Sequence, residues 1–214
     1  MRPHRLRSVL VTTLMLATAT VSGTTSATAH ASTAHASTAP ASATAASSLG
    51  ALTELFAERL LLADKVAAAK YGTESPIDDP VRERQILDDV AARAAGLGLD
   101  PDSVTAVFRD QIEANKLVQR GLYARWDAHP DERPTERPDL AKEVRPALDL
   151  ITTRLLAALQ ETTPVRADAS CEPRLYAAAT LSAYGHRLDV LHLKGLGRAL
   201  PSVCGTDRHG PAAT

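Results

Sequence analysis

The sequence predicts an all-α protein, an elongated bundle of about six helices. Three observations support this fold class. Apolar residues recur at every third or fourth position through three long stretches, as they do on the core-facing side of a helix. Gly and Pro gather between these stretches, where helices end. No stretch alternates β-branched and polar residues convincingly enough to predict a strand.

The first two helices are expected before residue 100. Residues 49–71 are rich in Ala, Leu, Glu and Lys, which favour a long helix, and residues 72–76 end it. A shorter helix is expected from Asp79 or Pro80 to Ala95, because two glycines follow it.

The third helix has the clearest start. Asp100 is a favourable N-cap and Pro101 suits the first helical position, so the helix is expected to run from here to about Ala128. Three prolines among charged residues then predict a surface crossing over residues 130–138.

Three more helices complete the prediction. A long helix is expected from about Asp139 to Glu161, with an irregularity at Pro146 because proline cannot donate the backbone hydrogen bond of a helix. Residues 173–184 and 186–200 should form the last two helices.

The N-terminus is typical of a secretory signal peptide, which we place at residues 1–31. Arginines precede an apolar run over residues 9–21, and small residues offering Ala-x-Ala cleavage sites follow it. The run is shorter than the roughly 20 residues that span a membrane. The sequence therefore predicts a secreted or periplasmic protein, with no membrane partner once the signal has been cleaved.

The chain that follows divides into three parts. Residues 32–48 are almost wholly Ala, Ser and Thr, which cannot bury a core, so they are expected to form a disordered tether. Residues 49–205 suit one domain with a single core, and residues 206–214 are expected to form a flexible tail.

The exported product keeps two cysteines, Cys171 and Cys204. An even number of cysteines after an export signal favours a disulfide between them. Two free buried thiols are the alternative. A zinc site would need more ligands than His186 and His192 supply, so no metal is expected.

Overall composition argues against a nucleic-acid partner. The formal net charge is -1 and the aromatic content is 3%. The chain therefore offers neither a basic surface for phosphates nor an aromatic platform for bases.

Polar residues interrupt the apolar stripes of the three long helices, and they are the candidates for function. Arg59 and Lys70 are eleven residues apart, which returns a helix to within roughly 20° of its starting direction, so they share a face. Asn115 and Gln119 share a face at i and i+4, and Arg154 comes from a later helix.

A second group lies around the start of the short helix, where Asp79, Arg82 and Glu83 cluster. Taken with the stripe residues, this gives four cations against two carboxylates. Buried cations without partners carry a desolvation penalty of several kcal/mol, so an anion is expected to neutralise the surplus. A small dicarboxylate with a further hydroxyl or ether oxygen fits this set.

Each residue alone also has an ordinary structural interpretation. Arg59 or Lys70 could extend to water from the edge of its stripe. Asn115 and Gln119 could be satisfied core amides, and Arg82 a solvated residue of a first helical turn. The joint pattern, rather than any one residue, favours a binding site.

The same residues resemble a known family. Residues 79–87, Asp-Pro-Val-Arg-Glu-Arg-Gln-Ile-Leu, are similar to the Asp-x-x-Arg-Glu-Arg-x-x-Leu helix of the all-helical chorismate mutases. Residues 58–60, 69–71 and 111–119 match the family in order and spacing. The cysteine pair, the export signal and Arg154 resemble its secreted subclass, and the resemblance extends over residues 49–205.

The resemblance implies a chorismate mutase, an isomerase of aromatic amino acid biosynthesis that converts chorismate to prephenate without a metal or organic cofactor. It implies that Arg59 and Arg154 bind the substrate carboxylates, and that Lys70 and Gln119 donate hydrogen bonds to the ether oxygen. Members of the family commonly form homodimers, and this resemblance is the sole basis for expecting one here.

The remaining roles also come from the resemblance. It implies that Asn115 helps hold a carboxylate, that Arg82 supports the anionic side of the site, and that Glu83, with Asp79, accepts a hydrogen bond from the substrate hydroxyl. Two other interpretations remain open from the residues themselves: a secreted helical binding protein for a small dicarboxylate, and a helical protein with a purely structural role.

Overall fold

The computed structural model describes residues 41–205, and the side chains from residue 48 onward. The six expected helices are all present in this part of the chain, which contains no strand. The main helices are α1 (Ala41–Lys70), α2 (Pro80–Gly96), α3 (Pro101–Ala128), α4 (Arg145–Glu161), α6 (Cys171–Gly185) and α7 (Val190–Arg198). Three short turns join them: η1 (Pro130–Glu132), η2 (Leu140–Val144) and α5 (Thr163–Arg166). The predicted all-α fold is confirmed.

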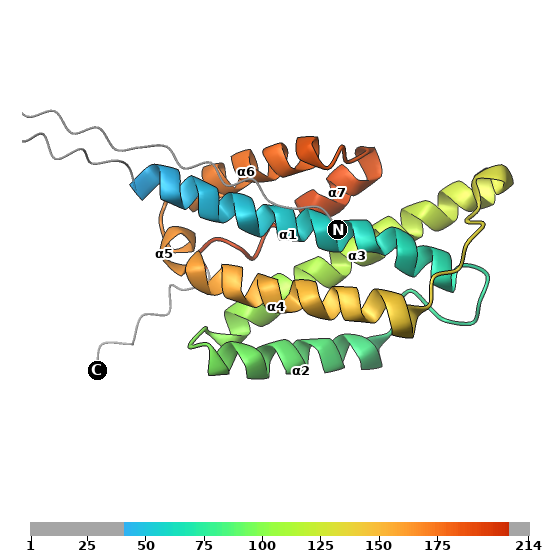
Figure 1. Ribbon diagram of the computed structural model, residues 1–214, viewed down its shortest axis with the longest axis horizontal. Coiled ribbons are helices and arrows are strands. Elements are labelled where there is room, and N and C mark those ends of the chain that lie inside the picture. The colour runs from blue at the N-terminus through green and yellow to red at the C-terminus, as the bar shows by residue number, and fades with distance from the viewer. Residues whose placement is uncertain (1–40, 206–214) are drawn as a thin grey trace, which may run out of the picture. The chain divides into compact units, whose positions relative to one another are not determined.

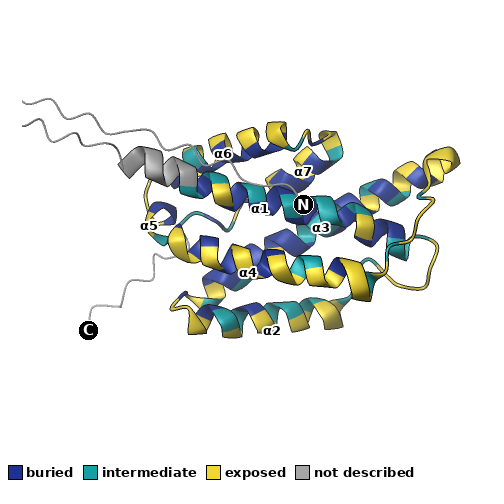
Figure 2. Ribbon diagram, in the orientation of Figure 1, coloured by how far each residue is buried: buried dark blue, intermediate teal, exposed yellow. Residues whose placement is uncertain are grey.

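Helices α1 and α3 form the centre of the bundle. Helices α2 and α4 lie along one side of them, and α6 and α7 pack on the other side (Figure 1). The core between these layers contains side chains with no exposed surface, among them Leu52, Phe56, Phe108 and Leu155. The outer faces of α2 and α4 are exposed along much of their length (Figure 2).

The predicted helix starts are confirmed by their caps. Asp79 accepts a hydrogen bond from the backbone N–H of Arg82 at 2.9 Å. Asp100 accepts from the N–H groups of Asp102 and Ser103, and each helix has proline in its first turn. These side chains satisfy backbone donors that have no partner within the helix.

The expected irregularity at Pro146 is present as a π-helical turn. Residues 140–144 of η2 are wound more widely than an α-helix and lead directly into α4, where Pro146 lies in the first turn. Proline has no N–H to close an α-helical bond onto the preceding turn, so the wider turn falls where that bond is missing.

Helix α1 begins earlier than expected. The structure extends it back to Ala41, into a segment that we predicted to be part of the tether. Alanine has the highest helix propensity, and lengthening an existing helix avoids the cost of nucleation. The signal peptide at residues 1–31, the rest of the tether and the tail at 206–214 lie outside the described residues.

The C-terminal region is tied to the bundle covalently. Cys171, at the start of α6, forms a disulfide with Cys204, with the two Cα atoms 5.8 Å apart. The predicted disulfide is confirmed, and the alternative of two free thiols is excluded. Beside it, the buried guanidinium of Arg166 donates to the carbonyl oxygens of Val203 at 2.9 Å and Leu159 at 3.1 Å.

Candidate active site

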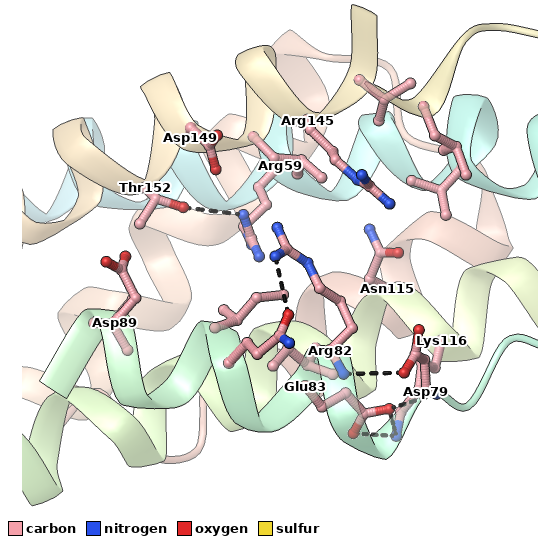
Figure 3. A pocket seen from close by; sticks show the side chains of 18 of the residues that line it. Arg59, Asp79, Arg82, Glu83, Asp89, Asn115, Lys116, Arg145, Asp149 and Thr152 are labelled. Carbon is pink, nitrogen blue, oxygen red and sulfur yellow. Dashed lines mark hydrogen bonds and ion pairs between the residues drawn. The ribbon is translucent and has the colours of Figure 1, made fainter. Parts of the chain in front are cut away.

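A cavity of about 550 Å³ lies among α1, α2, α3 and α4 (Figure 3). Its charged lining consists of Arg59, Lys70, Asp79, Arg82, Glu83, Asp89, Arg93, Lys116, Arg145 and Asp149. Six of these side chains are cationic and four are carboxylates, so the cavity carries a formal surplus of two positive charges. The structure thus brings together seven of the eight predicted substrate-binding residues.

Arg59 is the most deeply placed cation of the cavity, with 6% of its surface exposed. Its guanidinium donates to Thr152 Oγ1 at 3.4 Å and lies over the ring of Phe108, 5.7 Å from the centroid. Among the described residues no carboxylate is within ion-pairing distance, and the buried Nε has no hydrogen-bond partner.

Burial therefore dominates the charge state of Arg59. Loss of water around the guanidinium lowers its pKa to about 10, against the attraction of the Asp149 carboxylate. The side chain remains a cation at neutral pH. A buried cation without an ion-pair partner favours the binding of an anion, because the anion supplies the hydrogen bonds and charge pairing that the cation lost on leaving water.

Lys70 reaches the cavity from the last turn of α1. Its ammonium donates to the carbonyl oxygen of Pro76 at 2.8 Å, which connects the helix end to the loop that precedes α2. Burial lowers the pKa of Lys70, while the carboxylates of Asp79 and Glu83 oppose that shift. The lysine is half-buried and retains further N–H donors for a ligand.

Asn115 and Gln119 lie one turn apart on α3 and bond to each other. Gln119 Nε2 donates to Asn115 Oδ1 at 2.7 Å, whereas the buried Oε1 of Gln119 has no partner among the described residues. Each amide keeps N–H groups that are not used in this bond. The pair therefore presents uncharged hydrogen-bond donors beside the cations of the cavity.

The start of α2 supplies three more predicted residues. Asp79 caps the helix, and its own N–H donates to Glu83 Oε1 at 3.3 Å. Glu83 also accepts from Lys116 at 3.2 and 3.1 Å. Arg82 is exposed, and its guanidinium donates to Gln85 at 3.4 Å and points toward that of Arg59 (Figure 3).

The structure contradicts the prediction that Arg154 belongs to this site. Arg154 is exposed and forms an ion pair with Glu58 at 2.8 Å, outside the cavity. Arg145, nine residues earlier, lines the cavity instead. Nine steps of about 100° amount to two and a half turns, so the two arginines face opposite ways from one helix.

Sequence reasoning missed several lining residues that helical spacing could have found. Arg145, Leu148, Asp149 and Thr152 follow the spacing i, i+3, i+4 and i+7, which places them on one face of α4. Lys116 lies three residues before Gln119 and shares its face of α3. Arg93 and Asp89 line the cavity from α2.

The cavity combines a buried arginine, a pair of amides and two surplus positive charges within an all-α bundle, a lining whose charge complements a small dianion. Residues 50–120 match the family described as chorismate mutase type II. The secreted chorismate mutase of Mycobacterium tuberculosis is 34% identical over 156 residues, which are 73% of this chain and 78% of that protein. The secreted chorismate mutase of Mycolicibacterium smegmatis is 34% identical over 153 residues, 72% and 84% of the two chains.

Solved structures agree with the sequence comparisons. The crystal structure of the chorismate mutase from Burkholderia phymatum has a TM-score of 0.72 to this fold and 35% sequence identity. The match covers 75% of this chain and 98% of that one. This chain therefore belongs to the type II chorismate mutase family, and it is an enzyme, a chorismate mutase. The expectation drawn from the residues at 79–87 is confirmed.

Proposed function

We propose that the enzyme converts chorismate to prephenate in the cavity around Arg59. The observation that carries this assignment is the surplus of two positive charges around a buried guanidinium that has no carboxylate partner within residues 48–205, which complements a substrate with two carboxylates. In the rearrangement one C–O bond breaks while one C–C bond forms. No nucleophile is needed, so catalysis consists of holding the reactive conformer and stabilising the charge that develops on the ether oxygen.

Arg59 and Arg145 are our candidates for the two carboxylates. Arg59 projects from α1 and Arg145 from α4, and both line the cavity (Figure 3). A planar guanidinium can donate two parallel hydrogen bonds to a carboxylate, which fixes both its position and its orientation. Arg145 thus takes the role that the sequence comparison with the family had suggested for Arg154.

Lys70 and Gln119 are our candidates for donors to the ether oxygen. They come from α1 and α3 and line the same cavity, one as a cation and one as a neutral amide. Donors fixed before the reaction stabilise developing negative charge without reorganising. Asn115 supports a carboxylate, Arg82 contributes to the positive side of the site, and Glu83 with Asp79 accepts from the substrate hydroxyl.

The direct test is purified protein mixed with chorismate. We expect loss of the chorismate absorbance and formation of prephenate, which acid converts to phenylpyruvate. The other function that fits the same charges is a binding protein for a small dicarboxylate. Tight binding of chorismate without turnover would favour that alternative. A protein that neither binds chorismate nor turns it over would contradict both functions.

We also propose that the enzyme acts after export, in the periplasm or outside the cell. The names of the mycobacterial relatives, the expected signal peptide at residues 1–31 and the disulfide support this. Among the described residues no helix is long and apolar enough to cross a membrane. In this proposal residues 49–205 are the catalytic domain, residues 32–48 a tether whose last part begins α1, and residues 206–214 a tail, while a homodimer remains a prediction from the family.

A further inference from the structure

Lys116 is a buried cation at the cavity wall with three carboxylate partners. Its side chain is 10% exposed and forms ion pairs with Glu113 at 2.5 Å, Glu83 at 3.1 Å and Asp78 at 3.3 Å. Burial opposes the charge, but the hydrogen bonds that this ammonium donates to Glu113, Glu83 and Asp78 outweigh it and raise the pKa of Lys116. Lys116 therefore stays protonated at neutral pH.

These contacts connect three parts of the site. Glu113 and Lys116 lie on α3, Glu83 lies in the first turn of α2, and Asp78 lies in the loop before it. Arg120, one turn further along α3, also binds Asp78, at 2.6 and 2.7 Å. Of Lys116 and Arg120, only Lys116 contacts Glu83 in the described structure.

Glu83 lines the cavity, so its contact with Lys116 affects the charge that a substrate meets there. A free carboxylate in the cavity would repel a substrate that itself carries two carboxylates. Lys116 hydrogen-bonds to both oxygens of Glu83, which neutralises the carboxylate and fixes its rotamer. A carboxylate offers about four acceptor sites, so Glu83 can still accept a bond from a substrate hydroxyl.

Stability alone is a weak reason for such an arrangement. The desolvation of a buried ion pair commonly offsets its Coulombic gain, so an apolar side chain of similar volume would serve packing equally well. What the charged pair adds is a defined geometry at the cavity wall.

We propose that Lys116 is a positioning residue for the reaction, which acts by neutralising and orienting Glu83. This inference rests on the proposed function and deepens it, because it explains how a site for a dianion tolerates a carboxylate in its wall. It assigns Lys116 no direct contact with the substrate.

The test is a double-mutant cycle of wild type, Lys116→Met, Glu83→Gln and the double variant, with kcat and KM for chorismate measured for each. We expect Lys116→Met to lower kcat/KM by roughly 10- to 100-fold, mainly by raising KM, because misplacement of a site group has effects of this size. If Lys116 acts through Glu83, the double variant should match Glu83→Gln within about threefold.

Arg120→Met is the matched control. It removes a cation from the same helix and an ion pair with the same Asp78, but leaves Glu83 untouched. We expect its kcat/KM to stay within about threefold of wild type, since an exposed ion pair contributes little. A comparable loss in Arg120→Met would show that the effect comes from the loop or from net charge, and would overturn the proposal.

Four further outcomes are decisive. The role of Lys116 would be overturned if the fold-loss of kcat/KM in the double variant equals the product of the losses in the two single variants. An unchanged kcat/KM in Lys116→Met would overturn it as well. If Lys116→Met does not fold, as circular dichroism would reveal, the comparison of Glu83→Gln with the double variant decides: equal kcat/KM supports the proposal and a further loss overturns it. A wild-type protein without turnover would instead contradict the proposed function.

Discussion

Arg145 and Arg154 lie on opposite sides of α4. Arg145 lines the cavity, whereas Arg154 forms an ion pair with Glu58 at 2.8 Å on the protein surface. The helix thus assigns two residues of the same type to different environments. This pair allows the site to be tested with two chemically identical changes.

We expect Arg145→Met to lower kcat/KM by roughly 10- to 200-fold and Arg154→Met to change it by less than about threefold. The first change removes a charge-assisted hydrogen bond, worth about 1.5–3 kcal/mol, together with a positive charge of the cavity. The second removes an exposed ion pair of about 0–1 kcal/mol. Steady-state kinetics with chorismate measures both, and the reverse order of effects would place the site around Arg154.

The difference between these arginines also shows where sequence reasoning ends. Helix boundaries were predictable because Asp79 and Asp100 are local caps whose effect reaches only one turn. Which side of α4 turns toward the cavity depends on how the helix packs against the others. An apolar stripe through Arg154 includes Ile151 and Ala158, whereas one through Thr152 includes Leu155 and Leu159. Helical spacing therefore offers both faces, and the packing of α4 decides which one lines the cavity.

Other parts of the site could not be read from the sequence for a related reason. Arg59 and Lys70 were predictable because both lie on a single uninterrupted helix, where eleven residues restore the direction. The ion pairs of Lys116 with Asp78 and Glu83 join segments more than thirty residues apart. Which residues meet across such a distance depends on how the helices pack, which the helical period does not specify.

We expect Arg59→Met to abolish turnover while leaving the protein as stable as wild type or more stable. In the part of the chain that the structure describes, the guanidinium is buried without a carboxylate partner. The folded protein therefore bears its desolvation penalty, whereas methionine fills the space without one. Kinetics and thermal unfolding of the same preparation measure the two effects. A large fall in Tm would mean that Arg59 is a structural residue.

The amide at Gln119 should set the pH range of activity. An amide donates a hydrogen bond at any pH, whereas a carboxylic acid donates only while protonated, and its ordinary pKa is about 4.3. We expect wild-type kcat/KM to persist through neutral pH and Gln119→Glu to move the optimum toward acid. The kcat/KM of both proteins should be compared from acid to neutral pH. A wild type that is active only in acid would contradict this role of Gln119.

His192 should make folding stability depend on pH in the alkaline range. Its Nε2 lies 2.9 Å from Asp64 Oδ1 and its Nδ1 lies 2.7 Å from Asp189 Oδ1, which joins α7 to α1. Hydrogen bonding to Asp64 is the largest effect on this imidazole, and with the contribution of Asp189 it outweighs burial and raises the pKa to about 9.

The direction of this dependence follows from the raised pKa. The stabilisation is fully present below the unfolded-state pKa of about 6.5, and it is lost as the pH rises through about 9. We expect Tm to fall between pH 7 and about 10. His192→Gln should flatten the fall, and an equal slope in that variant would assign the effect to other groups.

Two glycines of α7 provide a test of how closely α7 packs. A Cβ at Gly195 would lie 2.9 Å from both Leu60 Cδ1 and Val118 Cγ2, whereas a Cβ at Gly197 would meet nothing within 4 Å. Overpacking of a core contact costs about 1–3 kcal/mol, while Gly→Ala at an exposed helical position stabilises by about 0.5–1 kcal/mol. We therefore expect Gly195→Ala to lower the free energy of unfolding and Gly197→Ala to leave it unchanged or raise it. Urea denaturation measures both, and equal effects at the two positions would show that α7 does not pack this closely against Leu60 and Val118.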